Sequence, residues 1–203
     1  MSVSEHDRSR IATAIRAAEA KTSGEIVCVL ARTSTDATAL PVLLAALLAL
    51  ALPWLLVALT EMSVHRILVL QIAVFCLLAA VLCLPRVRVA LLPRAARRHV
   101  SHRAAMEQFT LRGMVRKKDR TGILIFVSLA ERYARVIADE GIAGRVSQSE
   151  WQNAVDALIA HTRDGRIADG FIAAIEACGK VLAAHFPRTE TSRDELPDRI
   201  YLV

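Results

Sequence analysis

The sequence contains few of the residues that interrupt regular structure or cross-link a chain. Its 203 residues include only 8 glycines and 6 prolines, which excludes collagen-like and proline-rich low-complexity classes. The 4 cysteines show no Cys-x-x-Cys spacing, so no disulfide framework is expected. Charged residues make up only 23% and hydrophobic residues 54% of the chain. This composition excludes intrinsic disorder, and it is more apolar than an ordinary soluble domain.

Charge is missing altogether from two long stretches. Residues 37–59 and 67–84 contain no charged side chain and are rich in Leu, Ala and Val on every face. A helix rises about 1.5 Å per residue, so each stretch is long enough to cross a hydrocarbon core of about 30 Å. Only residues 60–66 separate them, which predicts a transmembrane hairpin over residues 37–84. The alternative is a pair of helices buried inside a soluble protein, but buried helices seldom lack charge over such lengths.

Small residues within the two stretches are expected to let the helices approach closely. These residues are Ala45, Ala49, Ala73 and Ala80.

Basic residues follow the second apolar stretch, in a juxtamembrane segment over residues 85–99 and just beyond it. The arginines are Arg86, Arg88, Arg94, Arg97, Arg98 and Arg103. Lys and Arg collect on the cytoplasmic side of a span, where they also attract anionic lipid. We therefore expect an inner (cytoplasmic) membrane protein with two spans, a lipid bilayer around them and both termini in the cytoplasm. No nucleic acid partner is expected despite the net charge of +6, because these arginines adjoin the membrane and no aromatics are interleaved with them.

The remaining residues alternate between helical and strand patterns. Ser4-Glu-His-Asp7 and Ser147-Gln-Ser-Glu150 have capping-box spacing ahead of apolar residues at helical intervals. Short β-branched runs bounded by turn residues are typical of buried strands. The predicted elements are a helix over 5–22, a strand over 25–30, a helix over 93–113, strands over 121–127 and 133–139, a helix from Trp151 to Gly165, and a last helix ending before Pro187.

This order of elements predicts an α/β fold with a small mixed sheet of three or four strands covered by helices. The first strand should lie beside the second, with a right-handed connection if the two are parallel. The five-residue loop before Tyr133 should make the second and third strands antiparallel. The membrane hairpin then lies inside the crossover after the first strand. The domain is expected in two parts, residues 1–36 and 100–186, followed by a polar tail over residues 187–203. We interpret Trp151 as a core residue and expect no cofactor pocket around it.

Several short motifs, in a fixed order, resemble the TPM domain. They are Lys118-Asp119-Arg-Thr-Gly122 before Ile-Leu-Ile-Phe-Val127, then Glu131-Arg132, Arg135-Val-Ile137, Gly141-Ile142 and Gly170-Phe171. Residues 104–186 carry the resemblance, and residues 5–31 fit the opening helix and strand of the family. The TPM domain is a small α/β module of thylakoid-lumen acid phosphatase-like proteins and of many bacterial membrane proteins. The resemblance implies calcium binding or hydrolysis of phosphate esters as activities to consider.

The chain departs from the family pattern after the third strand. The acidic position before the second strand matches as Asp119. The family commonly has a Gly-Tyr-Gly-Leu-Glu run where this chain reads Asp139-Glu-Gly-Ile-Ala143. Only Gly141 is retained, and Ala143 takes the place of the acidic residue.

Three acidic residues are the candidates for catalysis or for metal binding. Asp119 and Asp139 are candidate catalytic residues, and together with Glu140 they are candidate ligands of Ca²⁺, which binds several converging oxygens. The alternative is that they are solvated charges paired with Arg120, Arg135 or Arg145. The chain has no calcium-loop spacing, no Walker phosphate loop, no Gly-x-Ser-x-Gly elbow and no His-Glu-x-x-His.

Two functions from different classes therefore remain open. The first is a noncatalytic accessory protein that binds a membrane or cytoplasmic protein partner. The second is a phosphatase-like or calcium-dependent enzyme that uses Asp119 with Asp139 or Glu140. Carboxylates converging in a pocket would favour the enzyme, whereas carboxylates pointing apart would favour the accessory role.

Overall fold

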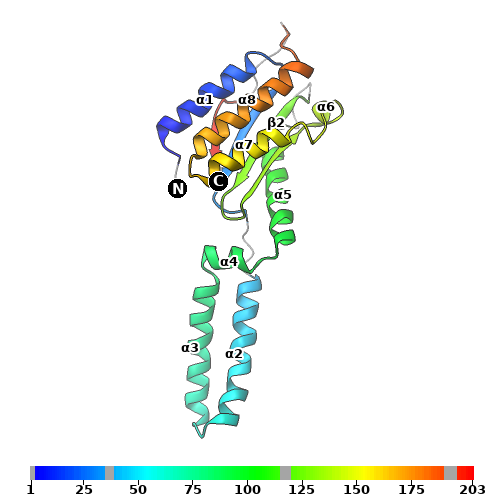
Figure 1. Ribbon diagram of the computed structural model, residues 1–203. Coiled ribbons are helices and arrows are strands. Elements are labelled where there is room, and N and C mark those ends of the chain that lie inside the picture. The colour runs from blue at the N-terminus through cyan, green and yellow to red at the C-terminus, as the bar shows by residue number, and fades with distance from the viewer. Residues whose placement is uncertain (1–2, 35–38, 115–119, 190–195) are drawn as a thin grey trace. The chain divides into compact units, whose positions relative to one another are not determined.

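A computed structural model describes residues 3–34, 39–114, 120–189 and 196–203 (Figure 1). The chain divides into two compact units. The first comprises residues 1–34 and 101–203, and the second comprises residues 35–100.

The first unit contains a four-stranded mixed sheet with the order β3-β2-β1-β4. β1 pairs with β2 in parallel, from Glu25 opposite Gly122 to Ala31 opposite Ser128. β2 pairs with β3 antiparallel, and β4 adds to the other side of β1 in parallel. The strands are β1 (Glu25–Ala31), β2 (Gly122–Ser128), β3 (Tyr133–Ala138) and β4 (Ile200–Leu202). Both predicted pairings and the predicted strand number are confirmed.

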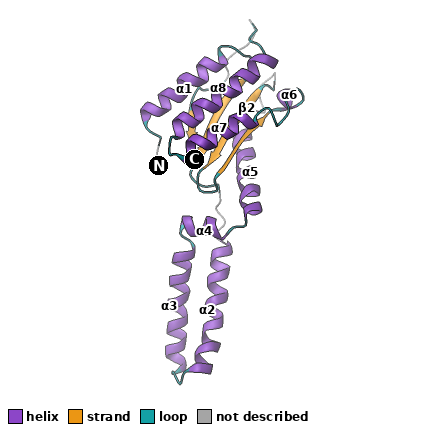
Figure 2. Cartoon of the chain, in the orientation of Figure 1, coloured by secondary structure: helices purple, strands orange, loops and turns teal. Residues whose placement is uncertain are grey.

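Helices cover both faces of this sheet (Figure 2). On one face, alternate residues of β1 and β2 such as Cys28 and Ile125 pack with α1 (Glu5–Glu19), α7 (Gln152–Arg163) and α8 (Ile167–His185). On the other face, the intervening residues, such as Val29 and Phe126, pack with α5 (Arg94–Leu111) through Ala105 and Phe109. All seven residues of β1 and all seven of β2 are buried. The apolar runs over residues 26–31 of β1 and 123–127 of β2 follow from this coverage on both sides.

The core confirms the interpretation of Trp151, which is 1% exposed.

Both capping signals also form hydrogen bonds. The Ser4 side chain accepts from the Asp7 amide at 3.1 Å, and the Ser147 amide donates to Glu150 Oε1 at 2.9 Å. This backbone hydrogen bond lowers the pKa of Glu150 below its usual value.

The second unit contains two long apolar helices that pack against each other. α2 (Ala39–Leu59) follows β1 in the chain, and α3 (Val64–Leu82) begins after a short link. Both are long and apolar enough to cross a membrane. In the most apolar 18-residue stretch of each helix, only 11% is buried in α2 and only 6% in α3. The predicted arrangement after the first strand is confirmed. Ala45 and Ala49 are buried, whereas Ala73 and Ala80 are exposed, so the prediction that all four face the partner helix was wrong for the second pair.

Three short elements were not predicted. α4 (Pro85–Leu91) occupies about half of the predicted basic juxtamembrane segment, and Pro85 stands in its first turn. α6 (Glu140–Ala143) directly follows β3. β4 lies within the expected polar tail. Each is seven residues or shorter, which is too short for hydrophobic periodicity to reveal.

Candidate functional site

Asp139 lies at the junction of β3 and α6 and caps the short helix. Its Oδ1 accepts a hydrogen bond from the Glu140 amide at 2.7 Å. The residue is 4% exposed, and its Oδ2 is buried without a hydrogen-bond partner among the described residues. The Asp139 amide donates to the Gly122 carbonyl at 2.9 Å, so the end of β3 and the start of β2 meet at one edge, as predicted.

Arg120 stands between the two described acidic candidates. Its Nη1 is 2.7 Å from Glu140 Oε2 and 3.7 Å from Asp139 Oδ1. The Glu140 side chain is 84% exposed and reaches out to this guanidinium. Arg120 has a φ of 49°, a backbone conformation that non-glycine residues rarely adopt. The third candidate, Asp119, lies outside the described residues.

The described residues do not by themselves form a calcium site. Calcium binds six to eight oxygens at about 2.3–2.6 Å, and no group of three or more His, Cys, Asp or Glu converges within the described ranges. The position next to both carboxylates is taken by the positive charge of Arg120, which opposes a second cation there. The expected alternative, a solvated charge paired with a neighbouring arginine, describes Glu140, whereas Asp139 is buried beside the same arginine.

The two cysteines of the first unit are not suited to act as nucleophiles. Cys28 and Cys178 are both fully buried. Burial raises the pKa of Cys178 to about 12. For Cys28, burial is the larger cause and the nearby Cys178 a smaller one, and together they raise its pKa well above the usual value. Both thiols therefore stay protonated, and a protonated thiol is a poor nucleophile.

A second polar cluster surrounds Glu131, which is 6% exposed in the loop between β2 and β3. Its carboxylate accepts from Thr33 Oγ1 at 3.0 Å and from the Ser34 amide at 3.1 Å. The Ser128 hydroxyl donates to the same carboxylate. The motif Glu131-Arg132 marked this residue in the sequence, but nothing in the sequence indicated that Thr33 and Ser34, 98 and 97 positions earlier, would donate to it.

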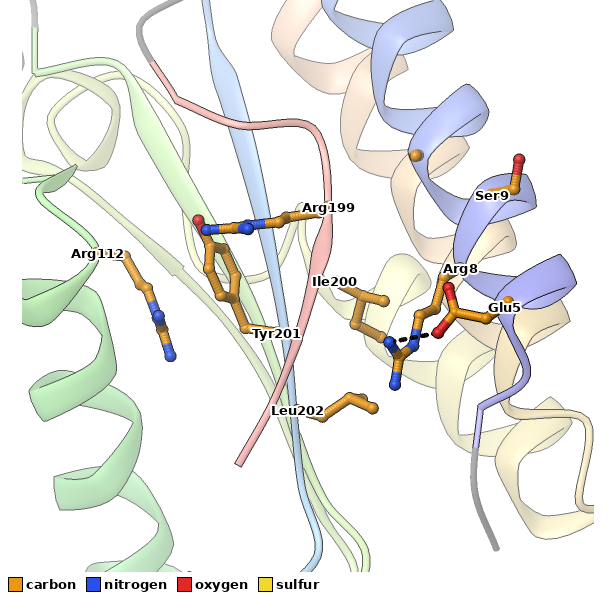
Figure 3. A pocket seen from close by; sticks show the side chains of 9 residues that line it. Glu5, Arg8, Ser9, Arg112, Arg199, Ile200, Tyr201 and Leu202 are labelled. Carbon is orange, nitrogen blue, oxygen red and sulfur yellow. Dashed lines mark ion pairs between the residues drawn. The ribbon is translucent and has the colours of Figure 1, made fainter.

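A third cluster gathers positive charge beside β4 (Figure 3). The guanidinium carbon of Arg112 lies 3.9 Å from the centre of the Tyr201 ring, and that of Arg199 lies 4.7 Å from it. The sequence analysis missed this cluster entirely, because β4 was not predicted and nothing in the sequence joins Arg112 to Tyr201.

Comparison with known proteins agrees with this architecture. The sequence model of the TPM domain matches residues 85–181. No curated protein matches the chain. The fold is similar to that in the NMR structure of the BA42 protein from the psychrophilic bacterium Bizionia argentinensis, with a TM-score of 0.63 and 22% sequence identity over 100% of this chain and 97% of that one. The matched region and the mixed sheet covered by helices lead to one conclusion: the chain contains a TPM domain.

Proposed function

We propose that this protein is a noncatalytic accessory protein. In this proposal, α2 and α3 anchor it in the inner membrane, and its TPM domain binds a protein partner in the cytoplasm. The observation that carries the noncatalytic role is the position of Arg120, whose Nη1 lies 2.7 Å from the exposed Glu140 carboxylate and 3.7 Å from that of Asp139. Both carboxylates face the same positive charge. That charge opposes a metal ion between them, which supports binding rather than metal-dependent catalysis.

The exposed apolar surface of the second unit supports the membrane anchor. Leu43, Leu47, Leu50 and Trp54 are between 55% and 83% exposed along α2. Water-soluble proteins rarely expose continuous apolar surface of this kind, and lipid tails are the environment in which it has no cost. The arginines after α3 support the cytoplasmic orientation, because Lys and Arg accumulate on that side of a span.

Trp54 offers a direct test of the anchor, because the chain has only 2 tryptophans. In a Trp151→Phe variant, Trp54 is the sole source of tryptophan fluorescence. We expect its emission to be strongly quenched when the protein is placed in bilayers of brominated lipid, because the 83% exposed indole would contact acyl chains. The measurement compares emission in brominated and unbrominated vesicles.

Unchanged emission in brominated lipid, or a chain that stays in the aqueous phase without detergent, would contradict the anchor. The orientation is tested separately by adding protease outside sealed spheroplasts. Protection of the C-terminal residues is expected, and their digestion would contradict the cytoplasmic placement.

Catalysis is tested by turnover of a generic phosphate ester and by a calcium-dependent thermal shift. We expect hydrolysis no faster than the buffer alone and no rise of the unfolding midpoint with calcium, since a ligand of the folded state must raise it. Hydrolysis that disappears in Asp119→Ala and persists in Asp164→Ala, an exposed aspartate elsewhere on the surface, would instead establish the phosphatase-like enzyme.

A further inference from the structure

The outer edge of β4 is an unpaired strand edge. β4 is the last strand in the order β3-β2-β1-β4. The Val203 amide donates to the Leu30 carbonyl at 3.0 Å, and the Val203 carbonyl accepts from the Arg32 amide at 2.9 Å. Since backbone groups alternate in direction along a strand, the amides and carbonyls of Ile200 and Leu202 point away from β1. No described residue pairs with them on that side.

A hollow of about 670 Å³ opens along this edge (Figure 3). Its wall on one side comes from α1, through Arg8 and Ser9. Arg112, just after α5, lines the other side, and all three residues of β4 contribute. The hollow therefore borders both faces of the sheet at its edge, which is the place where an added strand would lie.

The hollow carries positive charge that the described residues do not neutralise. Arg8 is paired with Glu5 at 2.7 Å. Arg112 and Arg199 stack on Tyr201, and neither forms an ion pair within the described part of the chain. Arg112 Nη2 donates to the neutral side-chain amide oxygen Oε1 of Gln108 at 2.9 Å, which leaves the charge of Arg112 uncompensated. Stacking on the ring limits the freedom of both side chains, so less entropy is lost when they bind a carboxylate.

We propose that the edge of β4 binds an extended, acidic segment of a partner protein. The segment pairs with the backbone of Ile200 and Leu202 and places carboxylates against Arg112 and Arg199. Strand addition of this kind takes affinity from backbone hydrogen bonds and specificity from side chains on alternate positions. An acidic partner is favoured over a neutral one by the two unpaired guanidinium groups. This inference rests on the proposed partner-binding function and names the surface and the chemistry of the partner.

The test uses the full chain in nanodiscs of neutral lipid and a peptide of alternating valine and glutamate. The peptide has about eight residues, a length within the usual range of strands. We expect hydrogen exchange of the Ile200 and Leu202 amides to slow on binding. Affinity should fall by about tenfold or more in Arg112→Gln/Arg199→Gln, because charge-assisted hydrogen bonds are lost. Arg163→Gln, at an exposed arginine of α7 that forms no ion pair among the described residues, is the control and should bind as wild type.

Changes to the peptide keep the test decisive if the double variant does not fold. A peptide with lysine in place of glutamate, and one with alternate amides N-methylated, should both fail to bind. Equal binding of the methylated peptide, or full competition by inorganic phosphate, would show a simple anion site and overturn strand addition. Absence of exchange protection also overturns it. These outcomes leave the proposed function standing, because they test this strand edge alone. Partner binding itself is overturned if capture from solubilised membranes yields no partner at all.

Discussion

Replacement of Glu131 with alanine is expected to lower the thermal midpoint of the protein by roughly 10 °C. The buried carboxylate accepts hydrogen bonds from Thr33, Ser34 and Ser128. Hydrogen bonds to a charged group contribute about 1.5–3 kcal/mol, and donors left buried without an acceptor add a further cost. A loss of about 3 kcal/mol corresponds to a shift of this size in a domain of this length. Thermal unfolding of the full chain in detergent measures it.

Two variants separate the hydrogen bonds from the simple loss of a glutamate. Glu131→Gln keeps one oxygen acceptor, so its midpoint should lie between wild type and alanine. Glu176→Ala removes an exposed glutamate from α8 and should change stability by no more than about 0.5 kcal/mol. Equal midpoints for Glu131→Ala and Glu176→Ala would show that the Glu131 cluster contributes nothing to stability.

Replacement of Gly170 with valine is expected to destabilise the domain by about 3 kcal/mol. A Cβ at this position of α8 would lie 3.0 Å from the Leu158 carbonyl oxygen and 3.2 Å from the His161 Cβ, both in α7. The backbone carbonyl cannot move aside without shifting its helix. Overpacking of this kind costs about 1–3 kcal/mol, and the β-branched side chain adds a small helix penalty. Chemical denaturation of the full chain would measure the loss.

Ala160→Val provides the matched control for the Gly170 substitution. It places the same β-branched residue at an exposed position of α7, where only the helix propensity changes. We expect a cost below about 1 kcal/mol. If both variants lost the same stability, the close approach of α7 and α8 would not be the reason for glycine at position 170.

The main strands and helices could be predicted because their sequence patterns are long. β1 and β2 are runs of seven buried residues, and such apolar runs are the strongest local signal of a strand covered on both faces. α1 was marked by its cap Ser4 as well as by apolar spacing. The Ser147 signal forms its hydrogen bond in the turn before α7, whose N-cap is Trp151, so α7 was marked by apolar spacing alone. The first helix was nevertheless predicted three residues too long, because Thr22 leaves the helix to bridge to Pro187. That contact joins distant parts of the chain and has no local signature.

The arrangement of the candidate site could be predicted only in part. The antiparallel hairpin correctly placed Asp139 near the start of β2. The sequence could not show that Asp139 would cap α6 or that Arg120 would adopt a positive φ and reach Glu140. The same limit applies to Arg112, Arg199 and Tyr201. Their contact depends on the pairing of β4 with β1, which is set by tertiary packing rather than by local preference.

The parallel pairing of β1 also determines when the sheet is completed during translation. A ribosome delivers the chain from its N-terminus, so β1 emerges well before β2 and β4, the two strands that flank it. The whole of residues 35–100 is made in the meantime. A nascent chain at that stage holds the apolar run of residues 26–31 in β1 without either of its neighbouring strands. The sheet is therefore completed only after the whole of the second unit has been synthesised.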